Sequence, residues 1–481
     1  MNATYRILTI LFLLFAISTG CKSRLDLQPE QSLTEEETFS SKSTTLSALL
    51  GVYSRCQLVE IFGSLPQILE DYMADNVEFR GTFPTLQQYY LYEGTSDNSS
   101  SRDIWRYSYE VILATNKVIA RVPEVNDPTF SDQEKAQYIA EAKFLRAYVY
   151  FQIVNLFAHP WQISQGSNPG VPLITADFNG DIEYPGRSTV LAVHAQIQKD
   201  LEEALPDLLN DFNPNAAFTR GRATKGAANA LLSRFHLYRG EWTQAADYAD
   251  DVLSNTALYD LAPNYGFYDG NTAEDVFTIQ NTPTDNGATS AGGWASYYNP
   301  TETSGRGDCP FSASLIAAFE EEPDDKRFLL STMGSSVGGV QRRFTTKYPD
   351  ASTNADNAPM IRVTEMYLNR AEALAQRDGI NITSINLMNE LRGRAGLGNW
   401  TLATFLTKQA FIDAILNERR KELCFEGHRR MDLLRNGKPL RTTGPTAPIS
   451  NPGDDFTILP IPQREIDVNA GLAGQQNSGY E

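Results

Sequence analysis

The chain has 481 residues, a hydrophobic fraction of 41% and a formal net charge of −18 at pH 7. This length can bury a large core, and the composition shows no sign of disorder. The acidic balance argues against nucleic acid as a partner, because phosphates would be repelled across most of the surface. A neutral ligand fits more easily.

The first 33 residues are expected to export the chain and to anchor it. Residues 1–20 contain one Arg, an apolar run over 7–17 and small side chains directly before Cys21. The run is too short to span a bilayer, which needs about 20 apolar residues, and with the cysteine it resembles a bacterial lipoprotein signal. We therefore expect a signal peptide over 1–20, acylation of Cys21 and a lipidated tether over 21–33. An ordinary secretory signal followed by a chance cysteine is the alternative, and it also predicts export.

Helical periodicity runs through most of the remaining chain. Capping boxes, Thr34 with Glu37 and Ser131 with Glu134, predict helix starts, and apolar spacing predicts helices within 46–59, 104–122, 138–157 and 189–209. Helix–turn–helix pairs are predicted over 224–253 and 362–396, with small residues and turn glycines placed as in tetratricopeptide units. We therefore predict a mainly all-α fold in which tetratricopeptide-like helical pairs form a scaffold, with spacing too irregular for a regular solenoid.

Two stretches lack this periodicity. Gly and Pro interrupt residues 62–100, and residues 255–357 show scattered Gly, Pro, Asn and Thr with one predicted strand at 275–280. A loop segment of this length is more often functional than inert. We expect one domain over 34–481, with the helical scaffold mainly in 34–260 and 358–435. A loop-rich, minor-β ligand-binding face is expected mainly in 261–357 and 436–481.

Residues 411–435, FIDAILNERRKELCFEGHRRMDLLR, begin as an amphipathic helix and are dense in charge. Glu and Arg recur three or four residues apart, so one carboxylate can serve two guanidiniums and the stretch can hold several segments together. The glutamates beside His428 could also be imagined as metal ligands, but the arginines at every interval would compete with a cation. We predict no metal site and a structural charge ladder of Glu418, Arg419, Glu422, Glu426, Arg429 and Asp432.

Catalytic and cofactor motifs are scarce. Only four His occur and none adjoins a Ser or Cys in a recognisable elbow; the four Cys form no CxxC pattern and indicate neither a disulfide scaffold nor a zinc site. No cofactor is expected. A carboxylate pair for glycoside hydrolysis is not excluded by counting, because 59 acidic residues guarantee some close pair.

Sugar binding finds better support in the composition of two loop stretches. Neutral sugars stack their C–H faces on aromatic rings, and their hydroxyls form hydrogen bonds with Asp, Asn and Arg side chains. Residues 71–92 and 292–299 combine such side chains, although the same aromatics could simply pack the loops against the helices. The candidate ligand-binding residues are Asp71, Asp75, Asn76, Arg80, Tyr89, Tyr90, Tyr92, Trp294, Tyr297 and Tyr298.

Motifs along nearly the whole chain resemble those of the SusD/RagB family. They are LDLQPE at 25–30, EAKFLRAYVYF at 141–151, GRATKGAANALLSRFHLYRG at 221–240, RVTEMYLNRAEAL at 362–374, ERRKELCFEGHRRMDLLRNGK at 418–438 and LPIPQREIDVN at 459–469. The resemblance implies a non-enzymatic outer-membrane lipoprotein that captures a nutrient, commonly a glycan, for a SusC-like TonB-dependent transporter. One departure is the sequence Lys-Ser-Arg at 22–24, which lacks the acidic run often found after the lipidated cysteine of surface-exposed lipoproteins.

Two other classes of function stay open at this point. One is an exported glycan hydrolase that uses a carboxylate pair, and it predicts turnover that disappears when one carboxylate is neutralised. The other is a periplasmic helical-repeat scaffold for protein partners, which predicts buried loop aromatics and an occupied concave helical face. The resemblance itself leaves the ligand open, because family members take different glycans and some handle peptides.

Overall fold

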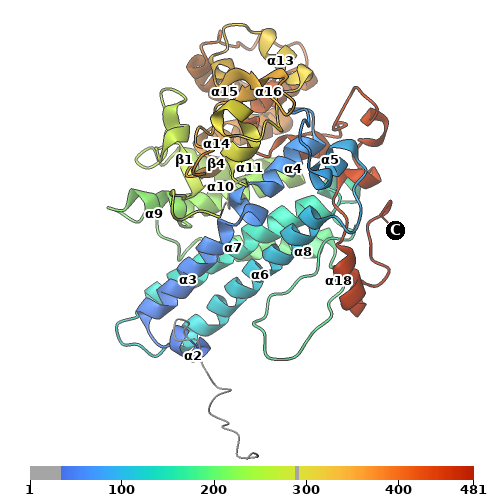
Figure 1. The fold of residues 1–481 in the computed structure, drawn as a ribbon. Coiled ribbons are helices and arrows are strands. Elements are labelled where there is room, and N and C mark those ends of the chain that lie inside the picture. Colours follow the sequence, from blue (N-terminus) through green and yellow to red (C-terminus); the bar gives the residue numbers. More distant parts are fainter. Residues whose placement is uncertain (1–33, 288–291, 481) are drawn as a thin grey trace, which may run out of the picture.

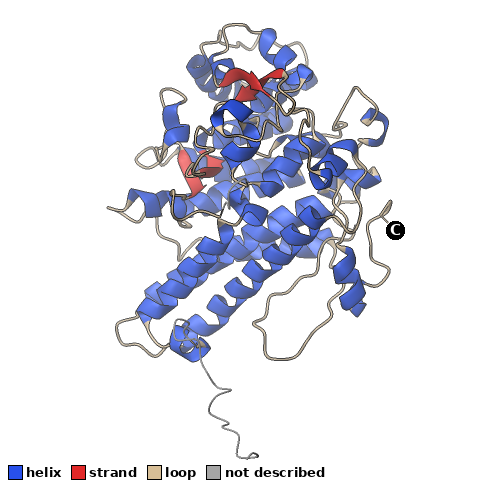
Figure 2. Ribbon diagram, in the orientation of Figure 1, coloured by secondary structure: helices blue, strands red, loops and turns tan. Residues whose placement is uncertain are grey.

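The computed structural model describes residues 34–287 and 292–480, so Cys21, the predicted signal peptide and the tether lie outside the described residues. Helices dominate these residues, and the strands form two small two-stranded sheets (Figure 2). The predicted mainly all-α fold is therefore confirmed. Within the described ranges, no helix combines the length and the apolar character needed to cross a membrane.

The first half of the chain contributes the long helices in the lower part of Figure 1. Helix α6 packs on α7, α7 on α8, and α10 on α11. Both predicted capping boxes are present, at the starts of α2 and α7. The helices are α2 (Glu35–Thr38), α3 (Lys42–Cys56), α4 (Leu65–Met73), α5 (Pro84–Leu91), α6 (Ser99–Arg121), α7 (Asp132–Phe157), α8 (Val190–Ala204), α9 (Ala216–Gly221), α10 (Lys225–Arg239) and α11 (Trp242–Leu253).

Most of the second half builds the upper part of Figure 1, whereas α18 lies lower, on the right beside the long helices. Here α14 packs on α15 and α16, and it also packs on α11 of the first half. The two predicted helical pairs, α10–α11 and α14–α15, therefore stack directly although a long loop-rich segment separates them in sequence. The helices are α12 (Trp294–Tyr298), α13 (Ala313–Glu320), α14 (Val363–Asp378), α15 (Ile382–Ala395), α16 (Lys408–Leu423), α17 (Arg429–Arg435) and α18 (Gln463–Val468).

Glycines end the first helix of each pair, as predicted. Gly240 follows α10 and Gly379 follows α14, both with φ 76°. This left-handed region strains residues that carry a Cβ, so glycine is the residue of choice where a helix must stop and turn. The turns of both helical pairs can therefore be predicted from the local sequence.

The sheets lie in the segment predicted to be loop-rich. Strand β1 (Asp275–Ile279) pairs antiparallel with β4 (Ala358–Arg362), which leads directly into α14. Strands β2 (Ser331–Ser335) and β3 (Gln341–Thr345) form a partly exposed antiparallel hairpin. The predicted strand at 275–280 is confirmed, and the other three strands were not predicted.

The prediction that residues 62–100 are mainly loop is wrong for α4 and α5. Pro66 and Pro84 occupy the first turns of these helices, where a backbone N–H has no intrahelical partner and proline is tolerated. The prolines therefore mark helix starts here. Tyr89 and Tyr90, expected on a loop, lie on α5.

Two apolar clusters fill the interior. The larger one includes most of α7, whose residues are buried on most sides as its sequence predicted. The smaller one lies between α14, α15 and α16 and includes Leu368, Ile385, Met388, Phe411 and Ile415. The charged stretch around α16 is thus attached to a small core of its own, beside the main core of the chain.

Candidate ligand-binding face

The charged stretch identified in the sequence is an interior clamp. We use clamp for α16, α17 and the turn between them, together with the charges that they pair with. Phe425 with φ 64° and Gly427 with φ 73° turn the chain from one helix into the other. The ion pairs include Glu418 with Arg327 (2.6 Å) and Arg392 (2.6 Å), Glu422 with Arg394 (2.8 Å), Glu426 with Lys347 (2.7 Å) and Arg362 (2.9 Å), and Arg419 with Asp432 (2.8 Å).

These carboxylates serve more than one cation each, but the cations come mainly from other segments. Arg362 ends β4, Lys347 follows β3, and Arg392 and Arg394 lie on α15. The spacing of three or four residues predicted ion pairs between adjacent turns of one helix. In the folded chain, most of these carboxylates pair instead with cations from distant segments. The clamp therefore joins the sheets and α15 to α16.

Burial and pairing together explain the ionisation of the clamp. Burial raises the pKa of Glu426, but the charges of Arg362 and Lys347 outweigh this effect and hold the pKa well below its ordinary value. Ionised carboxylates that already bind guanidiniums have little capacity left for a metal ion. Within residues 34–287 and 292–480, no group of three or more His, Cys, Asp or Glu is arranged to hold a metal.

Two of the predicted sugar-binding residues belong to this clamp. The Asp75 carboxylate lies 2.7 Å from Nε of Arg429 and 3.3 Å from Nη2 of Arg420. Oδ1 of Asn76 accepts a hydrogen bond from Nε of Arg420 at 2.9 Å, and Asn76 is buried. The expectation of free sugar-binding groups was wrong at both positions, because these side chains fasten the end of α4 to α16 and α17.

Most of the aromatic side chains predicted to bind a sugar are also buried. Of the two alternatives that the sequence left open for these aromatics, packing against the helices is the one observed, because α5 and α12 are helices that pack into the main core. Tyr298 donates a hydrogen bond from its hydroxyl to Asp71 at 2.5 Å, and its ring stacks on Tyr348 at 5.7 Å. The buried candidates are Asp71, Tyr89, Tyr92, Trp294, Tyr297 and Tyr298.

Tyr90 and Arg80 keep contact with solvent. The ring of Tyr90 is half-buried, and the guanidinium of Arg441 covers it at 4.1 Å from the ring centre. Arg80 is exposed at the end of an extended segment. Of the sequence candidates, Arg80 is therefore the most exposed, and its guanidinium pairs with Glu78.

The structure places part of the first predicted stretch beside the loop that follows the second. Backbone N–H groups of Glu78 and Arg80 donate to the carbonyls of Pro310 (3.0 Å) and Asp308 (2.9 Å). This pairing places residues 77–83 beside the 305–311 loop, which follows α12. Gly81 allows the close approach, because a Cβ there would lie 2.8 Å from the carboxylate of Asp308.

An aromatic ring and an ion pair stand at this junction. The guanidinium of Arg306 lies between the rings of Phe83 and Tyr297, at 4.1 and 4.2 Å from their centres. It also pairs with Asp308 at 2.7 Å. Phe83 is 51% exposed, so its ring is open to a ligand. We call the face formed by Arg80 and Phe83 the platform, and we include in it the Arg306–Asp308 pair that lies beneath Phe83, although Asp308 itself is buried.

Sequence reasoning missed three of these four residues. Phe83 lies within the predicted stretch 71–92 but is not among its candidates, and the run Gly-Arg-Gly-Asp at 305–308 lies outside both stretches. Gly307 has φ 69°, so glycine on both sides of Arg306 was the available signal of a tight, polar loop. Burial raises the pKa of Asp308, and the nearby Arg306 charge partly offsets that effect.

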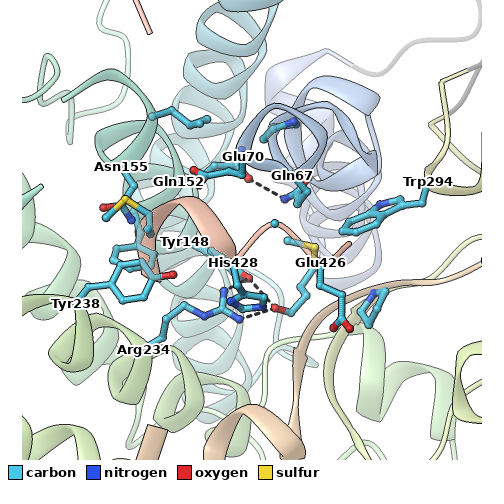
Figure 3. A pocket seen from close by; sticks show the side chains of 17 residues that line it. Gln67, Glu70, Tyr148, Gln152, Asn155, Arg234, Tyr238, Trp294, Glu426 and His428 are labelled. Atoms are coloured by element: carbon cyan, nitrogen blue, oxygen red, sulfur yellow. Dashed lines mark hydrogen bonds between the residues drawn. The ribbon is translucent and has the colours of Figure 1, made fainter. Parts of the chain in front are cut away.

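A polar cavity lies deeper, between α4, α7, α10 and the turn after α16 (Figure 3). Its volume is about 70 Å³, whereas pockets for organic ligands usually span roughly 300–1,000 Å³. Oε1 of Gln67, Oε2 of Glu70 and Nε2 of Gln152 have no hydrogen-bond partner among the described residues. The cavity suits water-sized molecules and excludes a sugar ring.

A larger groove of about 380 Å³ opens between α6, the 172–185 loop and α18. Its rim carries the exposed side chains Ile182, Tyr184 and Val468. Apolar and aromatic side chains supply most of its lining, and Arg106, Glu110, Glu183, Glu465 and Asn469 add polar groups. Tyr184 makes it the alternative site against which the platform must be tested.

Comparison with known proteins decides the family. Residues 331–480 match a model of the SusD family, and residues 24–237 match a family model described as starch-binding associating with outer membrane. The chain belongs to the SusD family. This family consists of carbohydrate-binding proteins that associate with the outer membrane, and the resemblance stated from the sequence motifs is confirmed.

Individual SusD relatives align over most of their length. SusD-like protein P2 of Formosa agariphila is 25% identical over 99% of both chains. Starch-binding protein SusD of Bacteroides thetaiotaomicron is 25% identical over 73% of this chain and 74% of that protein. A solved SusD superfamily protein of Bacteroides thetaiotaomicron superposes with a TM-score of 0.78 at 26% identity, covering 90% of this chain and 99% of the other.

Proposed function

We propose that this SusD-family chain is a non-enzymatic lipoprotein of the outer membrane that binds an oligosaccharide on the cell surface. In this proposal Cys21 carries the lipid, and the bound sugar passes to a SusC-like TonB-dependent transporter. The observation that carries the proposal is the platform, where the open ring of Phe83 stands beside the Arg306–Asp308 pair. The family description and the starch-binding relative support the ligand class.

The platform supplies both elements that sugar recognition needs. The C–H face of a pyranose ring stacks on the Phe83 ring, while hydroxyls hydrogen-bond to Arg80. The buried Asp308 holds Arg306 in place beneath the ring. Arg306 is fixed between two rings and paired with Asp308, so the site loses little side-chain freedom when a ligand arrives.

A hydrolase finds less support. Burial raises the pKa of both Glu70 and Asp71 to about 7, which would suit a general acid. Both carboxyl groups are buried, however, and the cavity beside Glu70 has a volume of about 70 Å³. A glycosidic bond cannot reach them without opening the core, so this pair of acids does not support catalysis.

Calorimetry with the mature, detergent-solubilised protein tests the binding proposal. A panel of oligosaccharides should include at least one ligand whose affinity falls when Phe83 is replaced in Phe83→Ala. The matched variant Tyr184→Ala, which truncates an exposed aromatic of the groove, should bind as the wild type does. Absence of binding to every oligosaccharide overturns the proposal, and loss in Tyr184→Ala alone moves the site to the groove.

Membrane placement needs separate experiments. Cys21→Ser should release the chain from the membrane fraction, and protease added to intact cells should cleave the wild-type protein. A TonB-dependent porin should co-purify with the wild-type chain from solubilised membranes. Protection from protease would place the chain on the periplasmic side, and a chain that purifies without any porin would contradict the transport role.

A further inference from the structure

We propose that the ligand of the platform is an acidic oligosaccharide of the uronate class, whose carboxylate is bound by Arg80 and Arg342. This inference rests on the proposed function and names the substrate class of the same site. It starts from the arrangement of charged side chains at the edge of the platform.

Four short extended segments lie side by side at this edge. Residues 77–80 pair with 308–311, Phe311 donates its N–H to the carbonyl of Arg343 on β3 at 2.8 Å, and β3 pairs with β2. Side chains alternate between faces in extended backbone. Val77 and Phe79 are buried in the core, so Glu78 and Arg80 point outward.

One carboxylate on this outer face serves two guanidiniums. Oε2 of Glu78 accepts hydrogen bonds from Nη2 and Nε of Arg80 at 2.8 and 3.2 Å. The same oxygen lies 3.7 Å from Nη1 of Arg342, beyond hydrogen-bond range. One of the two positive charges is therefore not neutralised.

Both guanidiniums have donors to spare. The side chains of Arg80 and Arg342 are 41% and 37% exposed. Nη1 of Arg80 has no hydrogen-bond partner among the described residues, and Arg342 makes no side-chain hydrogen bond to any of them. A planar guanidinium presents paired N–H groups that match a carboxylate, so this edge is suited to a second, external carboxylate.

The neighbouring charges do not cancel this surplus. Arg306 is balanced by Asp308, while the Glu302 carboxylate accepts hydrogen bonds from the backbone N–H of Ser335. Arg343 stacks on Phe328 at 4.3 Å and donates to Ser331. Arg343 follows Arg342 directly on β3 and therefore points to the opposite face. On the outer face, Arg80 and Arg342 share the carboxylate of Glu78, while Arg306 and Glu302 are engaged by other partners.

The two arginines lie near Phe83, the ring on which we propose that a sugar stacks. Phe83 follows Arg80 by three residues, and Arg80 and Asp308 share a backbone hydrogen bond. A uronate can therefore stack one ring on Phe83 while a carboxylate of the same chain reaches Arg80 or Arg342. A neutral glucan would gain the stacking alone.

Calorimetry with the mature protein tests the assignment, using oligogalacturonate, maltohexaose and laminarihexaose, with a sulfated oligosaccharide as a further probe. We expect oligogalacturonate to bind most tightly and its affinity to fall as NaCl rises from 50 to 300 mM, because salt screens exposed charges. Neutral ligands that bind as tightly as oligogalacturonate overturn the uronate assignment and leave the proposed function standing. Preference for the sulfated probe also overturns it, and binding of none overturns the proposed function itself.

Two substitutions give opposite expectations. Arg342→Gln should weaken oligogalacturonate binding about two- to fivefold, whereas Glu78→Gln should strengthen it by a similar factor, because it removes the competing carboxylate. The control Arg377→Gln alters an exposed arginine that pairs with Asp378 at the end of α14 and should leave binding unchanged. Unchanged thermal unfolding verifies the fold of each variant. Weaker oligogalacturonate binding in Glu78→Gln contradicts the proposal.

Discussion

The clamp and the platform are built from the same kinds of side chain and do different work. In the clamp, Arg362 is fully buried and contacts Glu274, Glu422 and Glu426. At the platform edge, Arg80 and Arg342 are exposed and share the single carboxylate of Glu78. Charge density alone therefore does not mark a binding site. We propose that donors which remain available at an exposed surface mark the site, and the following substitutions test this difference.

The largest effect is expected in the clamp. Glu422→Ala leaves Arg394 and Arg362 without one of their buried partners, and such a loss lowers the free energy of unfolding by about 3–5 kcal/mol. Denaturant unfolding measures it, with Glu78→Ala at the exposed face as the control. Oligosaccharide affinity should be unchanged in Glu422→Ala protein that still folds. Lost binding with unchanged unfolding would instead place the site in the clamp.

A second large effect concerns pH and the carboxyl group in the cavity. Burial raises the pKa of Glu70 from 4.5 to about 7, and Arg430 only partly offsets this. The folded state holds this proton more tightly than the unfolded state, so the contribution of Glu70 is fully present below pH 4.5 and is lost as pH rises to about 7. The loss amounts to about 3 kcal/mol at most, by the value of one pKa unit.

Thermal unfolding between pH 5 and 8 measures this dependence. In Glu70→Gln the fall in melting temperature over that range should be smaller than in the wild type. Asp71, whose pKa burial also raises to about 7, should supply the remainder. An identical pH profile in both proteins would show that Glu70 does not titrate in this range.

The stability that the clamp contributes should depend on pH in the opposite direction, because it is lost as the pH falls. Burial raises the pKa of Asp432, but Arg419 and Arg435 outweigh it and lower the pKa to about 2. The stabilisation is therefore present above the ordinary pKa and is lost as pH falls towards about 2. Asp432→Asn should lower the free energy of unfolding at pH 6 by more than at pH 2.5, as denaturant titrations would reveal. Equal losses at both pH values would contradict the ionised pair.

A smaller effect is expected at the platform. Phe83→Ala removes the stacking surface and should weaken oligosaccharide binding about tenfold, or roughly 1.4 kcal/mol, within the range for aromatic contacts. Its free energy of unfolding should stay close to that of the wild type, because the ring is 51% exposed. Calorimetry and denaturant unfolding together separate the two quantities. A variant that unfolds easily yet binds normally would show that Phe83 is a packing residue.

The smallest of these effects, a loss of free energy of unfolding, is expected for the ion pair that joins α17 to the end of α4. Arg429 pairs with Asp75, and both side chains remain partly exposed, at 13% and 22%. Arg429→Ala should lower the free energy of unfolding by about 1 kcal/mol, since solvent screens such pairs. A loss as large as that of Glu422→Ala would show that the clamp extends to the end of α4.

Much of the scaffold could be predicted from local patterns. The capping boxes at Thr34 and Ser131 and the turn at Gly240 act over a few residues, so the sequence shows them directly. The aromatic site could not be predicted in the same way. Trp294, Tyr297 and Tyr298 have the side chains that a sugar-binding loop needs. They lie on α12, however, which packs their rings into the core.

The sequence by itself determined the family, the helical pairs and the presence of a charge-dense stretch at 411–435. Only the tertiary structure decided the partners of that stretch, because Glu426 binds Lys347 from 79 residues away. It also decided which rings stay in solvent: Phe83 is exposed while Tyr89, six residues later, is buried. Helix periodicity and turn chemistry act between neighbours in sequence, whereas burial and ion pairing depend on segments that meet only in the folded chain.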